Sequence, residues 1–337
     1  MTTIPTLSVL DLGSVPRGAT SRDALLGATR LARRADDLGY HRFWVAEHHN
    51  MPIVASTSPT TLMAHLAAST THIRVGSGGV MLPNHPPLVV AEQVAMLEAL
   101  HPGRIDLGIG RAPGTDQATA AALRRTTDAL DAREFPQHLV DLLGLLGDVR
   151  EGSRLHGRFS ATPVATTHPP VFLLGSSGYS AQLAGMLGLA FVQAHHFDLG
   201  GTDESLRLYR QSFTPAGPLE HPHAIVSASV VVADTEERAR DLSLPGRLFR
   251  LWLRSGRDVR LLSVEEAREH PDLEAALAVP TEALVGDAEQ VAAGIDALVT
   301  RTGADEVMVT NTVVDYDDRI TSLELLADAV GLAPPTG

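Results

Sequence analysis

The 337-residue sequence contains no cysteine, and this absence excludes several kinds of chemistry at once. Disulfide bonds, zinc sites built from thiolates and thiol nucleophiles are all ruled out. No stretch approaches the roughly 18 uninterrupted apolar residues that a membrane-spanning helix requires, and the N-terminal residues lack a basic region followed by an apolar one. We therefore expect a cytoplasmic protein that does not contact a membrane.

Basic residues are also in short supply. The chain has 27 basic residues, all of them arginine, against 40 aspartate and glutamate residues, which gives a formal net charge of -13. This balance argues against nucleic acid or an anionic membrane as a partner, because both are recognised through positive charge. Any phosphate group that the protein binds must be held by a local arrangement of donors.

Short apolar segments alternate with helical patterns along the whole chain. The predicted strands are 7–11, 42–46, 72–77, 105–109, 171–174, 189–194, 225–233 and 306–310. The predicted helices are 21–38, 58–68, 87–100, 115–146 with an interruption at Pro136, 179–188, 287–301 and 323–330. Alternation of this kind implies a parallel sheet, and eight strands close a barrel, so we predict an α/β fold, a (β/α)8 TIM barrel with insertions.

An open doubly wound sheet is the competing architecture. Such a sheet would carry a phosphate-binding loop after its first strand, whereas the first strand here ends in Asp11, Leu12 and Gly13 without one. We expect a single domain over residues 1–337. Two segments fit no barrel unit: 147–170, rich in Pro, Gly, Ser and Thr, is expected to cross the surface, and 241–280 is expected to be an irregular lid or binding excursion.

Glycine-rich segments follow several predicted strands. Gly78 and Gly79 permit the close approach of a flat ligand, and the loop Gly175–Ser180 offers amides and hydroxyls at a helix N-terminus, an arrangement that suits a phosphate. Arg111 adds a full positive charge with bidentate geometry. Ordinary turns and a surface salt bridge are the alternatives for each segment alone. In a barrel, however, all of these strand ends open on one face, where active sites lie.

Histidines occur in pairs or beside polar residues at three strand ends. Glu47 is followed by His48 and His49, two imidazoles able to transfer protons near neutrality. Adjacent strand residues point to opposite faces and seldom share one metal ion, so we expect no metal site. Together with the Asn84–His85 and His195–His196 pairs, a mononuclear metal centre in a hydrolase stays open as an alternative, as does a purely structural role for each histidine.

Four motifs, in this order, resemble the bacterial luciferase-like flavin-dependent monooxygenases, and in particular their alkanal-monooxygenase-like subgroup. The motifs are Trp44–Asn50, Val75–Pro86, Pro102–Pro113 and Leu174–Ala184. The likeness runs from Leu7 to the last predicted helix. It implies a (β/α)8 barrel that binds reduced FMN at its C-terminal face and reacts it with O2 to give a C4a-(hydro)peroxide.

The resemblance also implies roles for individual residues. His48 matches the catalytic histidine, and Gly78–Gly79 matches a non-prolyl cis peptide under the flavin ring. Arg111, Ser177 and Ser180 match the ligands of the FMN phosphate. With the rest of the loop after the fifth strand, the residues expected to bind the cofactor are Gly78, Gly79, Arg111, Gly175, Ser176, Ser177, Tyr179 and Ser180.

The expected partners follow from the same resemblance. A separate flavin reductase would supply the reduced FMN, and the enzyme would oxidise a small organic molecule with O2. Relatives pair through the second and third helices, so we expect a homodimer whose contact is made by the apolar residues Leu62, Ala64, Ala67, Ala68, Val90, Val94 and Leu97. The alternatives are hydride transfer with the deazaflavin F420, and flavin binding without turnover.

This chain differs from the luciferases in two places, and these differences limit which family properties are expected of it. Ser176 stands where the luciferase catalytic subunit has glutamate, and the 241–280 segment shows little likeness to the luciferase mobile loop. That segment shapes the substrate pocket in the family. A long-chain aldehyde substrate and light emission are therefore not implied for this chain.

Overall fold

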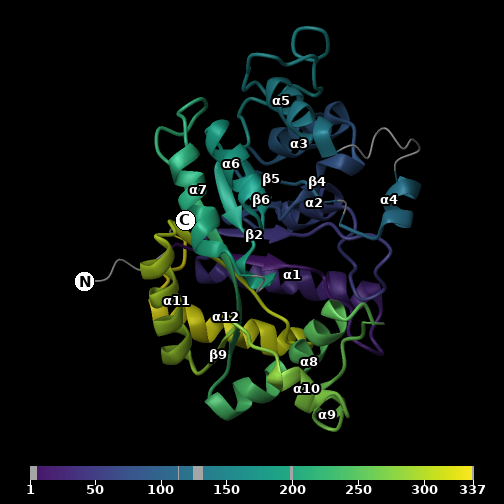
Figure 1. Ribbon diagram of the computed structural model, residues 1–337, viewed down its shortest axis with the longest axis vertical. Coiled ribbons are helices and arrows are strands. Elements are labelled where there is room, and N and C mark those ends of the chain that lie inside the picture. The colour runs from purple at the N-terminus through teal and green to yellow at the C-terminus, as the bar shows by residue number, and fades with distance from the viewer. Residues whose placement is uncertain (1–5, 113, 124–131, 198–199, 258, 336–337) are drawn as a thin grey trace.

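The computed structural model describes residues 6–112, 114–123, 132–197, 200–257 and 259–335. Eight parallel strands form a closed barrel, because β1 pairs with β2 on one side and with β10 on the other, and β10 also pairs with β8. The predicted TIM barrel is confirmed (Figure 1). Its strands are β1 (Thr6–Asp11), β2 (Arg42–Val45), β3 (Arg74–Ser77), β5 (Ile105–Gly110), β6 (Val171–Gly175), β7 (Ala190–Gln193), β8 (Ala224–Val232) and β10 (Glu306–Thr310).

Two further short strands lie at the carboxyl-terminal ends of barrel strands and were not predicted. β4 (Val80–Met81) pairs with the end of β5, and β9 (Leu284–Gly286) pairs with the end of β8. β8 has nine residues, and its last three pair with β9. All nine are buried, as expected for a strand that is covered on both faces.

Helices surround the barrel, and in Figure 1 α1, α12 and α11 lie side by side along one flank. α1 is defined at both ends by its sequence: the Thr20 side chain accepts a hydrogen bond from the amide of Asp23, and Gly39 ends the helix at φ 84°. The surrounding helices are α1 (Ser21–Leu38), α2 (Pro59–Ser69), α3 (Pro87–Leu100), α4 (Gln117–Leu123), α5 (Phe135–Leu145), α6 (Gly178–Met186), α7 (Thr202–Ser212), α11 (Ala288–Thr302) and α12 (Tyr316–Val330).

Three helices differ from the predictions. The predicted helix 115–146 is observed as α4 and α5, and its segment 124–131 lies outside the described residues. α12 begins seven residues earlier than the predicted start at 323, since the Asp315 side chain accepts hydrogen bonds from the amides of Asp317 and Asp318. α7 was not predicted; its buried residues Leu206 and Tyr209 lie on a helix that is otherwise strongly polar.

The prediction that 241–280 is irregular is wrong. The segment contains most of α8 (Glu236–Arg254), together with α9 (Val264–Arg268) and α10 (Leu273–Ala278), the green group at the lower end of Figure 1. Pro245 lies inside α8. A proline removes one helical hydrogen bond, but Leu242, Leu248 and Trp252 bury one face of this helix and stabilise it. The 147–170 segment has only an isolated bridge between His156 and Phe159.

The predicted dimer residues also need correction. Most of them are buried within the chain itself, because these apolar faces of α2 and α3 pack against the barrel: Leu62, Ala67, Val90, Val94 and Leu97 are at most 8% exposed. A different stripe of α3 faces outward, formed by Val89, Met96 and Leu100, which are 41%, 53% and 66% exposed.

A buried charge network fills the amino-terminal end of the barrel. Arg42 Nε lies 2.8 Å from Glu306 Oε1, and Arg42 Nη1 lies 2.8 Å from Asp106 Oδ2. Asp106 also accepts hydrogen bonds from Arg74 at 2.6 Å and from the indole of Trp44 at 3.0 Å. The strands finish at the opposite end, where the loops that follow them emerge. None of the helices in the described ranges has the length and apolarity that a membrane crossing requires.

Candidate active site

A cavity at the carboxyl-terminal end of the barrel, here called the rim cavity, gathers the ends of nearly all the barrel strands. Its floor is apolar and includes Leu10, Leu174, Val192 and Met308. Every predicted site residue except Tyr179 lines it: His48, Gly78, Gly79, Arg111, Gly175, Ser176, Ser177 and Ser180. Residues that lie far apart in the sequence therefore meet around one space.

One side of the rim cavity is suited to an anion. The guanidinium carbon of Arg111 lies 4.5 Å from the centre of the Tyr179 ring, and no carboxylate of the described chain pairs with Arg111. Ser177 is the N-cap of α6, yet its hydroxyl makes no capping hydrogen bond and is exposed. Gly175 allows the Ser180 side chain to approach, because a Cβ at residue 175 would lie 2.4 Å from Ser180 Cβ. A phosphate would find a cation, hydroxyls and helix N-terminal amides here.

The other side of the rim cavity is suited to a flat, largely apolar group. The Gly78–Gly79 peptide is cis, as the resemblance implies. A Cβ at Gly78 would lie 2.6 Å from Leu10 Cδ1, and a Cβ at Gly79 would lie 2.8 Å from the Gly108 carbonyl oxygen. A side chain at Gly79 would collide with backbone, and one at Gly78 would require Leu10 to move, so the bare backbone of the two glycines forms this wall of the cavity.

Glu47 fixes the loops around the two glycines. Its buried carboxylate accepts hydrogen bonds from His49 Nε2 and His85 Nε2, each at 2.8 Å, from the Asn84 side chain at 3.1 Å and from the Met81 amide at 2.9 Å. Burial alone would raise the pKa of Glu47, but the hydrogen bonds from His85, His49 and Met81 outweigh it and leave the pKa below its usual value. Glu47 is thus an ionised anchor between the end of β2 and β4.

His48 differs from its neighbour because it faces the rim cavity and has no partner. Its buried Nδ1 has no hydrogen bond within the described chain. Burial lowers the pKa of His48 below 6.5, with His49 adding to the effect and Glu47 opposing it. The imidazole is therefore mainly neutral near pH 7 and is available to exchange a proton with a bound molecule.

The paired histidines do not come together as metal ligands. His49 and His85 both bind Glu47, while His195 Nδ1 lies 2.9 Å from the Thr202 hydroxyl. Over the described residues, no group of three or more His, Asp or Glu side chains is arranged to hold a metal ion.

His196 and Ser227 were missed as site residues. His196 lines the rim cavity, and its Nδ1 lies 2.6 Å from Ser227 Oγ. The sequence did place a histidine pair after β7, but it did not indicate which of His195 and His196 turns inward. Ser227 lies in the middle of β8, where a small polar residue in an apolar strand was the available signal.

A second cavity, here called the α8 cavity, adjoins the first. Its volume is about 550 Å³, and it shares Leu12, His48, Ala112, His196 and Phe197 with the rim cavity. The remaining wall is mainly apolar and is closed by one face of α8. That wall includes Met51, Ile53, Val54, Gly246, Phe249, Arg250, Leu253 and Leu261. Two molecules bound in these cavities would meet beside His48 and His196.

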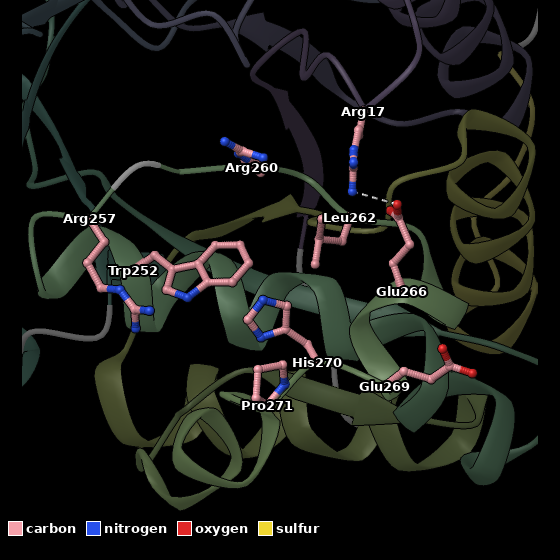
Figure 2. Close-up of a pocket in the computed structure, with 9 residues that line it drawn as sticks. All are labelled: Arg17, Trp252, Arg257, Arg260, Leu262, Glu266, Glu269, His270 and Pro271. Atoms are coloured by element: carbon pink, nitrogen blue, oxygen red, sulfur yellow. Dashed lines mark hydrogen bonds and ion pairs between the residues drawn. The ribbon is translucent and has the colours of Figure 1, made fainter.

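A third hollow lies apart from this site, between the end of α8 and α9 (Figure 2). Trp252 and His270 lie next to each other there, with ring centres 5.0 Å apart. Arg17 pairs with Glu266 at 2.7 Å, and Arg257 pairs with Asp272 at 2.8 Å. This hollow shares no lining residue with the rim cavity or the α8 cavity.

The chain is similar to known proteins over nearly its whole length. Residues 7–306 match the family model described as luciferase-like monooxygenase. A luciferase-like monooxygenase of Escherichia coli K12 is 42% identical over 328 residues, covering 95% of this chain and 96% of that protein. The N-acetyl-S-alkylcysteine monooxygenase of Bacillus subtilis is 34% identical, covering 96% of this chain and 98% of the other.

A more distant relative and a solved structure add to this. The oxygenase component of the flavin-dependent trigonelline monooxygenase of Acinetobacter baylyi is 28% identical, over 72% of this chain and 71% of that protein. The crystal structure of apo-MsnO8 superimposes with a TM-score of 0.87 and 35% identity, and covers 98% of this chain and 99% of the other. The chain belongs to the luciferase-like monooxygenase family.

Proposed function

We propose that this protein is a flavin-dependent monooxygenase that uses reduced FMN and O2 to oxidise a small organic substrate. The observation that carries the proposal is the meeting, in one cavity, of Arg111, the hydroxyls at the start of α6, the cis Gly78–Gly79 peptide and His48. Reduced FMN bound there would supply the electrons that activate O2. The protein's task is to hold the cofactor, exclude water and manage protons.

The proposed mode of FMN binding follows from the two sides of the rim cavity. Arg111, Ser177 and Ser180 hold the phosphate at the positive end of the α6 dipole. Tyr179 lies against the Arg111 guanidinium and fixes its plane. The ring system lies over Gly78–Gly79 and the apolar floor, where side chains would block it.

The substrate is proposed to occupy the α8 cavity, and His48 to serve as the catalytic residue. His48 lines both cavities, so its imidazole touches the place where the substrate meets the cofactor. α8 covers the α8 cavity with Phe249 and Leu253 and so limits access of water. The same face of α8 decides which substrates fit, and it belongs to the 241–280 segment, which shows little likeness to the luciferase mobile loop.

A separate reductase is proposed to deliver the reduced FMN. This is supported by the Acinetobacter baylyi relative, whose name describes it as the oxygenase component of its system. We also propose that the protein forms a homodimer through α3, whose outward stripe of Val89, Met96 and Leu100 is apolar and exposed.

The first prediction concerns the phosphate site. Arg111→Met should weaken FMN binding about 10-fold to 100-fold, because charge-assisted hydrogen bonds to the phosphate are lost. Riboflavin, which lacks the phosphate, should bind the wild type and the variant equally. Fluorescence titration of both flavins measures this, with the exposed Arg240→Met as the matched control. Equal losses for FMN and riboflavin, or no loss for FMN, would show that Arg111 does not bind the phosphate.

The same titration separates FMN from F420. The monooxygenase proposal expects the protein to bind FMN much more tightly than the deazaflavin. A clear preference for F420 would contradict the monooxygenase proposal and would indicate hydride transfer with F420 in the same barrel.

The second prediction concerns His48. Reoxidation of the protein-bound reduced FMN by O2 should change rate as the pH falls through a value below 6.5, because burial lowers the pKa of His48 and the ring gains a proton only there. His48→Gln should remove this inflection while leaving FMN affinity nearly unchanged. Stopped-flow absorbance measures both, and His65→Gln on α2 is the control. An identical pH profile in wild type and His48→Gln would remove His48 from the mechanism.

The third prediction concerns assembly. Light scattering should give twice the chain mass of 35.8 kDa, and a Met96→Asp/Leu100→Asp double variant should give the monomer mass, because the charges would be buried at the contact. Leu277→Asp on α10, where the wild-type leucine is 51% exposed, is the control and should remain dimeric. A wild-type protein of monomer mass would refute the dimer.

A further inference from the structure

His196 lies where the rim cavity and the α8 cavity join, in a short 3-10 helix (His195–Phe197) that follows β7. Its neighbour His195 turns the other way: Nδ1 contacts the Thr202 hydroxyl at 2.9 Å and Nε2 lies 3.2 Å from Glu282. The ring of Phe197 packs on that of His196, with ring centres 4.3 Å apart. Of this histidine pair, only His196 therefore lines the place where a cofactor and a substrate would meet.

Hydrogen bonds to Ser227 fix the tautomer of His196. The Ser227 hydroxyl has one proton and donates it to the Gln193 carbonyl oxygen at 3.1 Å, since a carbonyl can only accept. The tautomer that makes this bond and the 2.6 Å bond between His196 Nδ1 and Ser227 Oγ at the same time carries its proton on Nδ1, and we assign that tautomer to His196. Nε2 is left with its lone pair, and within the described chain it has no hydrogen-bond partner.

The surroundings keep this ring neutral. Burial, followed by the charges of Arg250, His195 and His48, lowers the pKa of His196 to about 3. A group with so low a pKa is a poor proton acceptor in catalysis near pH 7, so His48 remains the better candidate for moving protons. His196 instead presents a fixed lone pair, which attracts an O–H or N–H group and repels a carboxylate.

We propose that His196 is a positioning residue whose Nε2 accepts a hydrogen bond from an O–H or N–H group of the substrate where the two cavities join. The preferred substrates are then mainly apolar molecules that carry such a donor near the reacting atom. Pure hydrocarbons, which offer no hydrogen-bond donor, are disfavoured. This inference rests on the proposed function and defines the substrate class of the same site.

Two small probes test the inference in the FMN-loaded protein by calorimetry. Phenol donates a hydrogen bond, and anisole is similar in shape but has no donor. Wild type should bind phenol about tenfold more tightly than anisole. His196→Leu should abolish the difference between phenol and anisole, whereas His196→Gln, whose amide oxygen can accept, should retain part of it. His65→Leu is the control and should behave as wild type.

Three results would overturn the inference. One is equal binding of phenol and anisole to wild type, and another is an unchanged preference in His196→Leu. The third result concerns whether the hydrogen-bond donor to His196 Nε2 belongs to the substrate or to the flavin. If His196→Leu alters only the ratio of affinities for reduced and oxidised FMN, the partner of Nε2 is an N–H of the flavin. If the wild type does not bind FMN at all, the proposed function itself is contradicted, and this outcome is distinct from the three results above.

The tautomer is tested directly by NMR of protein labelled with ¹⁵N-histidine. The signal that disappears in His196→Leu should be that of a neutral ring with its proton on Nδ1 between about pH 5 and 8. Ser227→Ala should release this preference and mix the two tautomers. A proton on Nε2, or protonation of the ring near pH 6.5, would contradict the inference independently of any ligand.

Discussion

Parallel pairing of β1 with both β2 and β10 is the interaction on which the rest of the structure depends. Together with the β10–β8 pairing it closes the sheet, and all eight barrel strands then run the same way. Every loop that follows a strand must emerge at the same end. Closure alone therefore brings His48, Arg111, Ser177 and Ser227 around one cavity, although long stretches of chain separate them.

The two ends of the barrel have different roles, and their charges reflect this. At the amino-terminal end, Arg42 is held between Glu306 and Asp106, and although burial opposes ionisation, the contacts with His223 and Arg42 keep the pKa of Glu306 low. Removing one partner from such a network typically costs about 3–5 kcal/mol, because a charge is left buried without compensation. At the other end, within the described chain, Arg111 has no carboxylate partner and the Nδ1 atom of His48 has no hydrogen bond. The side chains that face the rim cavity without a protein partner therefore lie at the carboxyl-terminal end.

Much of this was predictable because barrel strands and strand-end motifs are local features. Runs of apolar and small residues such as 225–233 indicated the strands, and the glycine and serine loops indicated the rim. Predictions from the sequence were wrong where a local pattern conflicted with the packing of distant residues. Pro245 and Gly246 resemble a helix break, but burial of Leu242, Leu248 and Trp252 keeps α8 continuous. The apolar residues of α2 and α3 were assigned to a dimer, whereas barrels use that helix face for their own core.

Other features depended on side-chain direction, which a sequence does not reveal. His195 and His196 are adjacent and chemically identical, yet one binds Thr202 and the other lines the cavity. Tyr179, predicted as a cofactor-binding residue, is not among the residues that line the rim cavity and packs on Arg111, which does line it. The roles proposed for His48, Arg111 and the serines still rest on their convergence.

The proposed function requires that the rim cavity hold FMN with its phosphate at the start of α6 and its ring over the two glycines. A crystal structure of the protein with FMN bound tests this most directly. The account predicts phosphate oxygens within about 2.7–3.2 Å of the Arg111 guanidinium and the Ser177 hydroxyl, with the ring against Gly78–Gly79. A phosphate bound elsewhere, for example in the arginine-lined hollow of Figure 2, or a ring that does not touch the glycines, would contradict it.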